Sequence, residues 1–486
     1  MDNETFALSV LIGAAVLVAA VFSNRLTRLL RIPAPALFLL LAAVAALFLP
    51  AFTEAARTID ERVVSIALVI ILFDGGRHIG WARFRRSWGP IVWIGIAGTA
   101  VTAAAIAVAA HFLFAFEWQS SLLLGAALSP TDPAVVFNVL GRREISGRSG
   151  TILEGESGAN DPVGIALMLS LLAVGGSGLD SVGTGIGTFA LQLAIGAVVG
   201  IGGGLGLAWV MRHIRFPDEA LASVFTVAAA VLLYALGTVL HGSGFLAAFL
   251  PGILIGDVRA PYKREIQRFG AGLASLAEIT VFILLGLSIR LQDVLRPDLL
   301  LTGLAIAALL IFVARPVFVG VLLLPVRLRR GERAFVLWAG LKGAVPILLG
   351  MFVLESGAPR AGDLYAIVFI VVLVSVLLQG GLVPVFARLF RVPMRTVDAR
   401  PWSLDVRFAD EPEGLNRHVV AAGSPADGHT VAEISTGDDA WISLISRAGR
   451  HVPVRNGTRL RAGDVVLTQS DGDEQLASRF EPTEDS

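Results

Sequence analysis

Long apolar stretches dominate the chain up to about residue 390 and alternate with short polar loops. A helix that crosses a bilayer needs about 20 apolar residues. Thirteen stretches approach that length, which predicts an α-helical polytopic membrane protein. They lie at residues 5–24, 34–51, 63–76, 89–113, 119–140, 150–174, 184–211, 219–240, 243–257, 270–289, 299–324, 333–355 and 363–388.

The pattern changes after Arg391, so we divide the chain into a transmembrane domain at 1–391, a linker at 392–414 and a small α/β domain at 415–486. The linker is polar and contains Pro. About 70 residues bury little core alone, so the last domain is expected to dimerise. Its predicted elements are strands at 417–422, 440–445 and 465–468, an extended segment at 451–454, and helices at 430–434 and 473–480.

The composition supports a membrane protein. Of the 486 residues, 55% are hydrophobic and 16% are charged, and the mean hydropathy is +0.75. A soluble protein of this size carries far more charge. The chain has no Cys, which excludes disulfides and thiolate metal sites. The first span lacks a basic leader and a clear cleavage site, which predicts a retained helix and not a signal peptide.

The basic residues are distributed unevenly between loops. Twenty Lys and Arg residues fall in alternate loops, and only five fall in the loops between them. Cytoplasmic loops of membrane proteins are the basic ones. We therefore expect an odd number of spans in the cell (inner) membrane, with the N-terminus outside and the C-terminal domain in the cytoplasm.

Two acidic segments interrupt neighbouring spans. Asp132 lies in Ser-Pro-Thr-Asp-Pro at 129–133, and Asp161 lies in Gly-Glu-Ser-Gly-Ala-Asn-Asp-Pro at 155–162. An ionised Asp in hydrocarbon is costly and therefore indicates a functional site. Pro follows each Asp, removes a backbone donor and disfavours helical geometry at the preceding residue. Both spans are thus predicted to be broken helices near the bilayer midplane, as in ion-coupled transporters.

Oxygen-bearing side chains accompany the two acids. Burial disfavours an ionised carboxylate, so a buried Asp can hold a proton or a dehydrated alkali cation, but not both favourably. Hard cations prefer oxygen ligands. Either Asp could instead be structural, and each hydroxyl or amide could be a helix-packing residue. Together they predict a cage in which proton and cation compete, with further oxygens from Ser129, Thr131, Ser157 and Asn160.

Other charges lie inside or beside the spans. Asp74, near the inner end of the third span, could be a ligand or an interfacial residue. Glu156 and Arg315 would each be very costly alone, which predicts a structural ion pair. Lys342 lies in segment 340–346, which interrupts the twelfth span, and could offset the negative end of a half-helix. Gln379 could bond across helices or simply pack.

The two interruptions fall at corresponding positions of the chain. Six-helix halves on either side of one central helix would be inverted relative to each other, as is common in secondary transporters. The fifth span, interrupted at Pro130 and Pro133, would then correspond to the twelfth. This predicts inverted repeats whose broken helices cross at the binding site.

From about residue 5 to 390 the chain resembles the NhaP-type monovalent cation/proton antiporters, which are relatives of the eukaryotic sodium/proton exchangers. The resemblance rests on segments 129–133, 155–162 and 340–346, on Ala314-Arg315-Pro316 and on Leu-Leu-Gln-Gly at 377–380. It implies electroneutral exchange of one cation for one proton by alternating access. It also implies a homodimer in which a core domain moves against a dimerisation domain.

The same resemblance implies individual roles. Asp161 would be the main ion and proton carrier, and its coordination would be completed by Asn160, Ser157, the Thr131 backbone and Asp74. Glu156 and Arg315 would be the buried structural pair, and Asp132 would help to balance the crossed half-helices. Two positions depart from the family pattern, Asp74 where many relatives have Glu and Lys342 where Arg is usual. A shorter acid changes the size of the cage and leaves the ion preference open.

The tail at about 415–480 is similar to the ligand-binding half of potassium-transport regulatory (TrkA-C, or RCK-C) domains, on the basis of Val-Ala-Glu-Ile at 431–434 and Leu-Arg-Ala-Gly-Asp-Val-Val-Leu at 460–467. This similarity favours potassium as the exchanged cation, with sodium as the alternative. In some relatives the module binds a small regulator such as a cyclic dinucleotide. No cofactor and no nucleic-acid partner are expected.

Two other functions compete with exchange. A ligand-gated cation channel would need a selectivity filter, and the sequence has no filter-like repeat. An intramembrane aspartyl protease could use Asp132 and Asp161 as a catalytic dyad, but the expected Gly-x-Gly-Asp motif is missing. The sequence therefore predicts a transporter and not an enzyme.

Overall fold

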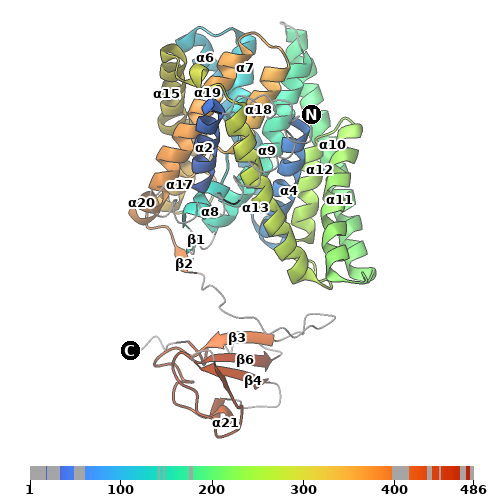
Figure 1. Ribbon diagram of the computed structural model, residues 1–486, viewed down its shortest axis with the longest axis vertical. Coiled ribbons are helices and arrows are strands. Elements are labelled where there is room, and N and C mark those ends of the chain that lie inside the picture. Colours follow the sequence, from blue (N-terminus) through green and yellow to red (C-terminus); the bar gives the residue numbers. More distant parts are fainter. Residues whose placement is uncertain are drawn as a thin grey trace. The chain divides into compact units, whose positions relative to one another are not determined.

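The computed structural model describes residue 18 and residues 33–48, 61–140, 143–145, 148–174, 179–396, 415–434, 440–447, 450–470 and 478–481. The chain divides into two compact units, Met1–Trp402 and Ser403–Ser486. The first is helical and the second contains a small sheet (Figure 1). The predicted span at 5–24 lies outside the described residues, apart from Val18.

The helical unit follows the predicted spans closely. Each of the twelve predicted spans from residue 34 onward coincides with one helix or with consecutive helices. The helices are α2 (Ala34–Phe48), α4 (Glu61–Ile79), α5 (Trp81–Trp93), η1 (Ile94–Gly98), α6 (Thr99–Phe114), α7 (Trp118–Ala127), α8 (Ala134–Leu140), α9 (Arg148–Val174), α10 (Leu179–His213), α11 (Glu219–Val239), α12 (Gly244–Ile255), α13 (Lys263–Ser288), α14 (Leu291–Val294), α15 (Pro297–Leu309), η2 (Leu310–Val319), α16 (Gly320–Leu322), α17 (Arg330–Trp338), α18 (Ala344–Glu355), α19 (Ala361–Val374), η3 (Ser375–Gly380) and α20 (Gly381–Leu389).

Six continuous helical stretches in the described part of the chain are long and apolar enough to cross a membrane. They are Trp81–Phe114, Gly183–His213, Glu219–Val239, Lys263–Ser288, Pro297–Leu322 and Ala361–Leu389. Three of them contain a π-helical segment, η1, η2 or η3, within the run. The fold is thus that of a helical polytopic membrane protein, as predicted.

The two acidic spans differ from each other. The fifth predicted span is broken between α7 and α8, as expected, and the twelfth is broken between α17 and α18. The prediction of a break in the sixth span is wrong, because α9 continues through Pro162. A proline removes only one helical hydrogen bond. Packing of α9 against α5, α7 and η1 holds the helix together around that position.

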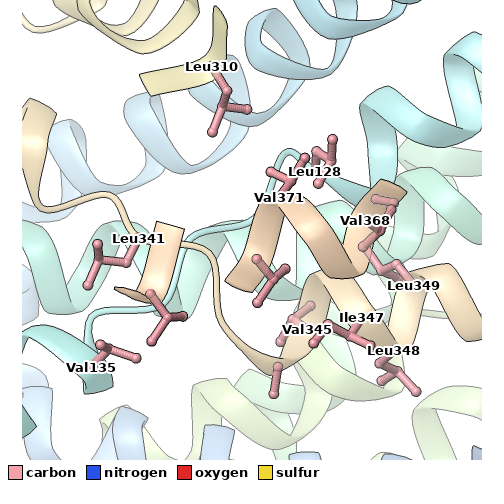
Figure 2. Packing of buried hydrophobic residues seen from close by; sticks show 14 of the residues in the cluster. Leu128, Val135, Leu310, Leu341, Val345, Ile347, Leu348, Leu349, Val368 and Val371 are labelled. Atoms are coloured by element: carbon pink, nitrogen blue, oxygen red, sulfur yellow. The ribbon is translucent and has the colours of Figure 1, made fainter. Parts of the chain in front are cut away.

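A continuous apolar core surrounds the two breaks. Leu128 and Val135 flank the first break, and Leu341 and Val345 lie in or beside the second (Figure 2). All four are buried. Burial of their side chains excludes water from the extended backbone, so the polar groups freed there must find partners within the protein.

A short antiparallel pair closes one end of the helical unit. Strand β1 (Arg143–Ile145) follows α8, and strand β2 (Met394–Thr396) follows α20. Residues 394–396 fall in the predicted linker. This part of the linker is therefore a strand that pairs with β1. Pairing supplies hydrogen-bond partners to both segments, which are far apart in sequence.

The second unit is an antiparallel sheet with the order β3-β6-β4-β5. Its elements are β3 (Leu415–Val419), α21 (Val431–Ile434), β4 (Ala440–Arg447), β5 (Arg450–Val452) and β6 (Val465–Ser470). These correspond to the predicted strands and to the first predicted helix. The predicted helix at 473–480 lies largely outside the described residues, and its described end, 478–480, is a turn.

One ion pair fixes the loop before β6. Arg447 donates to Asp464 at 2.8 and 2.7 Å, and the Arg461 amide donates to the same carboxylate at 2.9 Å. Burial alone would raise the pKa of Asp464, but these bonds outweigh it and hold the pKa below its usual value. The carboxylate therefore stays ionised at neutral pH and ties β4 to the turn at 461–464.

Candidate functional site

Two extended connections meet inside the helical unit. The first joins α7 to α8 and contains Pro130 and Pro133. The second joins α17 to α18 and contains Gly340 and Gly343. The Asp132 amide donates to the Leu341 carbonyl at 2.8 Å, which ties the two breaks together. Each break thus supplies a hydrogen-bond partner that the other lost when its helix was interrupted.

The polar face of α9 lies against the first break. Ser157 Oγ donates to the Thr131 carbonyl at 2.6 Å, and Asn160 Nδ2 donates to Thr131 Oγ1 at 2.7 Å. The Thr131 amide in turn donates to Asn160 Oδ1 at 3.3 Å. Residues 157, 160 and 161 share one face because they are three and four positions apart on a helix. The structure therefore brings together three of the predicted site residues, Thr131, Ser157 and Asn160.

Asp161 adds an unsatisfied carboxylate oxygen to this face. The residue is 6% exposed, and its Oδ1 is buried without a hydrogen-bond partner. The neighbouring charges that act on the carboxylate are those of Asp132 and Lys342. A buried oxygen left unpaired is costly and rare in folded proteins. Such an oxygen, on the helix face that also carries the Ser157 hydroxyl, is suited to hold a proton or a cation.

Lys342 lies in the second break, and its side chain reaches the first. Its ammonium group donates to the carbonyls of Ser129 and Pro130, at 3.0 and 2.9 Å, and its side chain is buried. Carbonyls at a helix C-terminus carry a partial negative charge and lack helical partners. The Lys342 ammonium group thus lies against two carbonyls of the first break, just beyond the end of α7.

Glu156 and Arg315 form the buried ion pair that the sequence predicts. Arg315 donates to Glu156 Oε1 at 2.8 Å, and both residues are no more than 4% exposed. The guanidinium also donates to the carbonyls of Val336 and Leu337 at the end of α17. Gly340 leaves room for it, because a Cβ there would overlap the guanidinium. The pair joins α9 to η2 and to the second break.

Asp74 has different neighbours from the other predicted site residues. Its carboxylate pairs with Arg77 on the same helix and lies 3.2 Å from His78 Nδ1. Arg77 is buried and also donates to the carbonyls of Ile266 and Gln267 on α13. Among the hydrogen bonds of the described residues, none joins Asp74 to Thr131, Ser157, Asn160 or Asp161. Sequence reasoning assigned Arg77 to a loop and missed this partner, although the three-residue spacing from Asp74 pointed to it.

A small substitution at Gly343 should disturb the contact between the two breaks. A Cβ there would overlap the Cβ and carboxylate of Asp132, so Gly343→Ala should displace Asp132. The cation/proton exchange that the sequence predicts should fall about five- to 150-fold, if overpacking of about 1–3 kcal/mol acts on it in full. Cation-driven proton movement in vesicles measures this. Gly362→Ala is the matched control, because a Cβ on Gly362 meets nothing within 4 Å. Equal activity of the two variants would contradict the prediction.

Comparison with known proteins places this chain in a family. A family model described as the transmembrane sodium/hydrogen exchanger matches residues 13–389. The chain is 33% identical over 426 residues to the K(+)/H(+) antiporter NhaP2 of Shewanella sp. strain ANA-3, covering 86% of this chain and 73% of the relative. It is 34% identical over 407 residues to the K(+)/H(+) antiporter NhaP of Alkalimonas amylolytica, covering 83% of this chain and 70% of the relative.

A solved structure has the same fold. The sodium proton antiporter MjNhaP1 from Methanocaldococcus jannaschii superimposes with a TM-score of 0.67 at 23% identity, over 78% of this chain and 100% of that chain. At this identity the likeness concerns the fold alone. Together with the family match and the two relatives, it shows that the chain belongs to the sodium/hydrogen exchanger family and is a multi-pass membrane antiporter of monovalent cations and protons.

Proposed function

We propose that the protein exchanges K⁺ for H⁺ and that Asp161 carries both ions in turn. The observation that supports this most is the buried Oδ1 of Asp161, which has no hydrogen-bond partner, on the same face of α9 as Ser157, whose hydroxyl oxygen donates to the Thr131 carbonyl oxygen. When ionised, the carboxylate binds a cation with help from these oxygens. When protonated, it has lost the charge that made the cation bind.

Exchange follows because the two ions share one group. A cation that arrives from one side displaces the proton, and the occupied site then reorients to the other side. There a proton displaces the cation, and the site returns. The Thr131–Asn160 bonds hold the first break against α9, so the oxygens of the cage move as one body with Asp161.

Asp74 has a smaller part in this proposal than in the sequence-based expectation. Arg77 already neutralises its carboxylate, so cation binding at Asp74 would require that pair to open. Asp132 is proposed to act through charge, because it lies close enough to influence the Asp161 carboxylate. Lys342 is proposed to balance the half-helix and not to bind the transported ion.

Potassium is proposed over sodium because two of the relatives are named K(+)/H(+) antiporters. A sodium/proton antiporter is the second candidate. It is favoured by the low-affinity Na(+)/H(+) antiporter NhaS1 of Synechocystis, which is 29% identical over 66% of this chain. Everted membrane vesicles with a preformed pH gradient separate the two. K⁺ should collapse the gradient at lower concentration than Na⁺, and the reverse order would assign sodium.

The pH dependence follows from the shared carboxylate. As the pH falls, protons occupy Asp161 more often, and the concentration of cation needed for half-maximal exchange, K0.5, should rise. For simple competition, K0.5 rises up to about tenfold per pH unit once the proton dominates. Exchange measured at fixed K⁺ should therefore weaken under acid conditions. A K0.5 that is constant from acid to alkaline pH would contradict competition at one group.

We also propose a homodimer with the N-terminus outside and the second unit in the cytoplasm. The basic residues in alternate loops support this orientation. The second unit is proposed to regulate exchange, in the manner of the TrkA-C domains it is similar to, by binding a small ligand. Its hydrophobic core is small, which favours pairing with a second copy.

A further inference from the structure

Two buried polar side chains of π-helix η3, Ser375 and Gln379, contact the second break. They are 0% and 1% exposed. Ser375 Oγ accepts from the Lys342 amide at 3.0 Å and donates to Gln379 Oε1 at 2.5 Å. Gln379 Nε2 donates to the Trp338 carbonyl at 3.1 Å. The proposed cation cage does not include either residue.

These bonds satisfy the backbone groups that the interruption of the helix leaves unpaired. Trp338 is the last residue of α17 and Lys342 lies in the break, so neither group has its ordinary helical partner. Inside a membrane such groups need partners within the protein. The Trp338 indole also donates to the Gln379 carbonyl at 3.3 Å and stacks on Phe386 of α20, with ring centroids 3.9 Å apart. Hydrogen bonds donated from η3 to the break, and from the break to η3, therefore hold the two segments together.

The network continues from Lys342 to the proposed cation site. Its backbone is held by Ser375, and its ammonium group reaches the Ser129 and Pro130 carbonyls of the first break. One residue earlier, the Leu341 carbonyl accepts from the Asp132 amide. Displacement of the Lys342 backbone would thus move a charge that acts on Asp161 and loosen the connection that presents the Thr131 carbonyl.

We infer that Ser375 and Gln379 are positioning residues that set the affinity of the antiporter for its cation by fixing the second break against the first. This inference rests on the proposed role of Asp161. Among the described residues, no hydrogen bond joins either side chain to the cage oxygens or to Asp161, and the two residues act through the Lys342 and Trp338 backbone. π-Helical segments within membrane helices often occur at such functional positions.

Vesicle exchange with Ser375→Ala tests the inference. The variant removes both bonds of Ser375 Oγ, and loss of the one that holds the Lys342 amide should raise K0.5 for K⁺ about three- to tenfold. The maximal rate should stay within about twofold. Ser375→Thr, which keeps a hydroxyl, should restore K0.5. The matched control is Ser170→Ala on α9, because Ser170 is 1% exposed and its Oγ has no hydrogen-bond partner.

Gln379→Met gives a second, independent variant. It removes both side-chain bonds of Gln379, to Ser375 Oγ and to the Trp338 carbonyl, but keeps the bond between Ser375 and the Lys342 amide. Because the Lys342 backbone stays tied to Ser375, a smaller rise in K0.5 is expected. It replaces Ser375→Ala as the test if that variant does not accumulate in the membrane. A K0.5 equal to that of Ser170→Ala overturns the inference. Since all values are compared with the wild-type protein, a missing wild-type response counts against the proposed function instead.

Discussion

Replacing Asp161 with Asn will abolish cation-driven proton movement while leaving the protein in the membrane. The amide has nearly the volume of the carboxylate, so the packing of α9 is preserved. It can neither carry a negative charge nor release a proton at physiological pH. Cation binding and proton transfer at this position therefore both stop. Because the buried Oδ1 of Asp161 has no hydrogen-bond partner, no structural bond is lost at that atom.

Everted vesicles from cells that express the variant provide the measurement. A preformed pH gradient should persist on addition of K⁺ or Na⁺, with a response below about one-hundredth of the wild-type value, the order expected when a charge-bearing group is lost. Asp298→Asn is the control, because Asp298 lies in an exposed pair with Arg296. Retained exchange in the Asp161 variant would assign the carrier to another group.

Breaking the buried ion pair will destabilise the protein more than breaking an exposed one. Glu156→Gln leaves Arg315 without a counter-charge in the core, where the two side chains are 4% and 5% exposed. Removal of one partner of such a pair typically costs about 3–5 kcal/mol. The purified variant should therefore unfold at a clearly lower temperature, and less of it should accumulate in the membrane.

Two variants make this prediction specific. Replacing both residues, as in Glu156→Gln with Arg315→Met, should recover part of the loss, because no uncompensated charge remains. Asp298→Asn breaks a pair whose side chains are 46% and 59% exposed, and exposed pairs contribute about 0–1 kcal/mol. If Glu156→Gln unfolds at the same temperature as Asp298→Asn, the pair does not stabilise the fold as described.

Local signals predicted most of the architecture around the site. Pro130 and Pro133 forecast the first break, and the glycines at 340 and 343 forecast the second, because each limits helical geometry by its own chemistry. The Glu156–Arg315 pair could be predicted since two opposite charges in apolar spans have few other ways to be neutralised. That Lys342 offsets the negative end of a half-helix stays a prediction of the same kind.

Features that depend on tertiary contacts could not be predicted. Pro162 signalled a break in α9, but packing on its neighbours keeps that helix continuous. Arg77 was expected in a loop, whereas contact with α13 buries it beside Asp74. Ser375 carried no signal of its own, because a lone Ser in an apolar span is usually a packing residue. Its role depends on a contact between distant parts of the chain, the bond that its hydroxyl accepts from the Lys342 amide.

The exchange of one ion for the other at a single carboxylate can be measured directly on the purified protein. Addition of K⁺ to the protein in weakly buffered detergent solution should release protons, because cation binding to a protonated ligand displaces its proton. Release should approach about one proton per chain at a pH where the cation-free carboxylate is protonated and K⁺ saturates the site. Asp161→Asn should release none. Equal proton release from the wild-type protein and Asp161→Asn, or cation binding without release at any pH, would contradict the account.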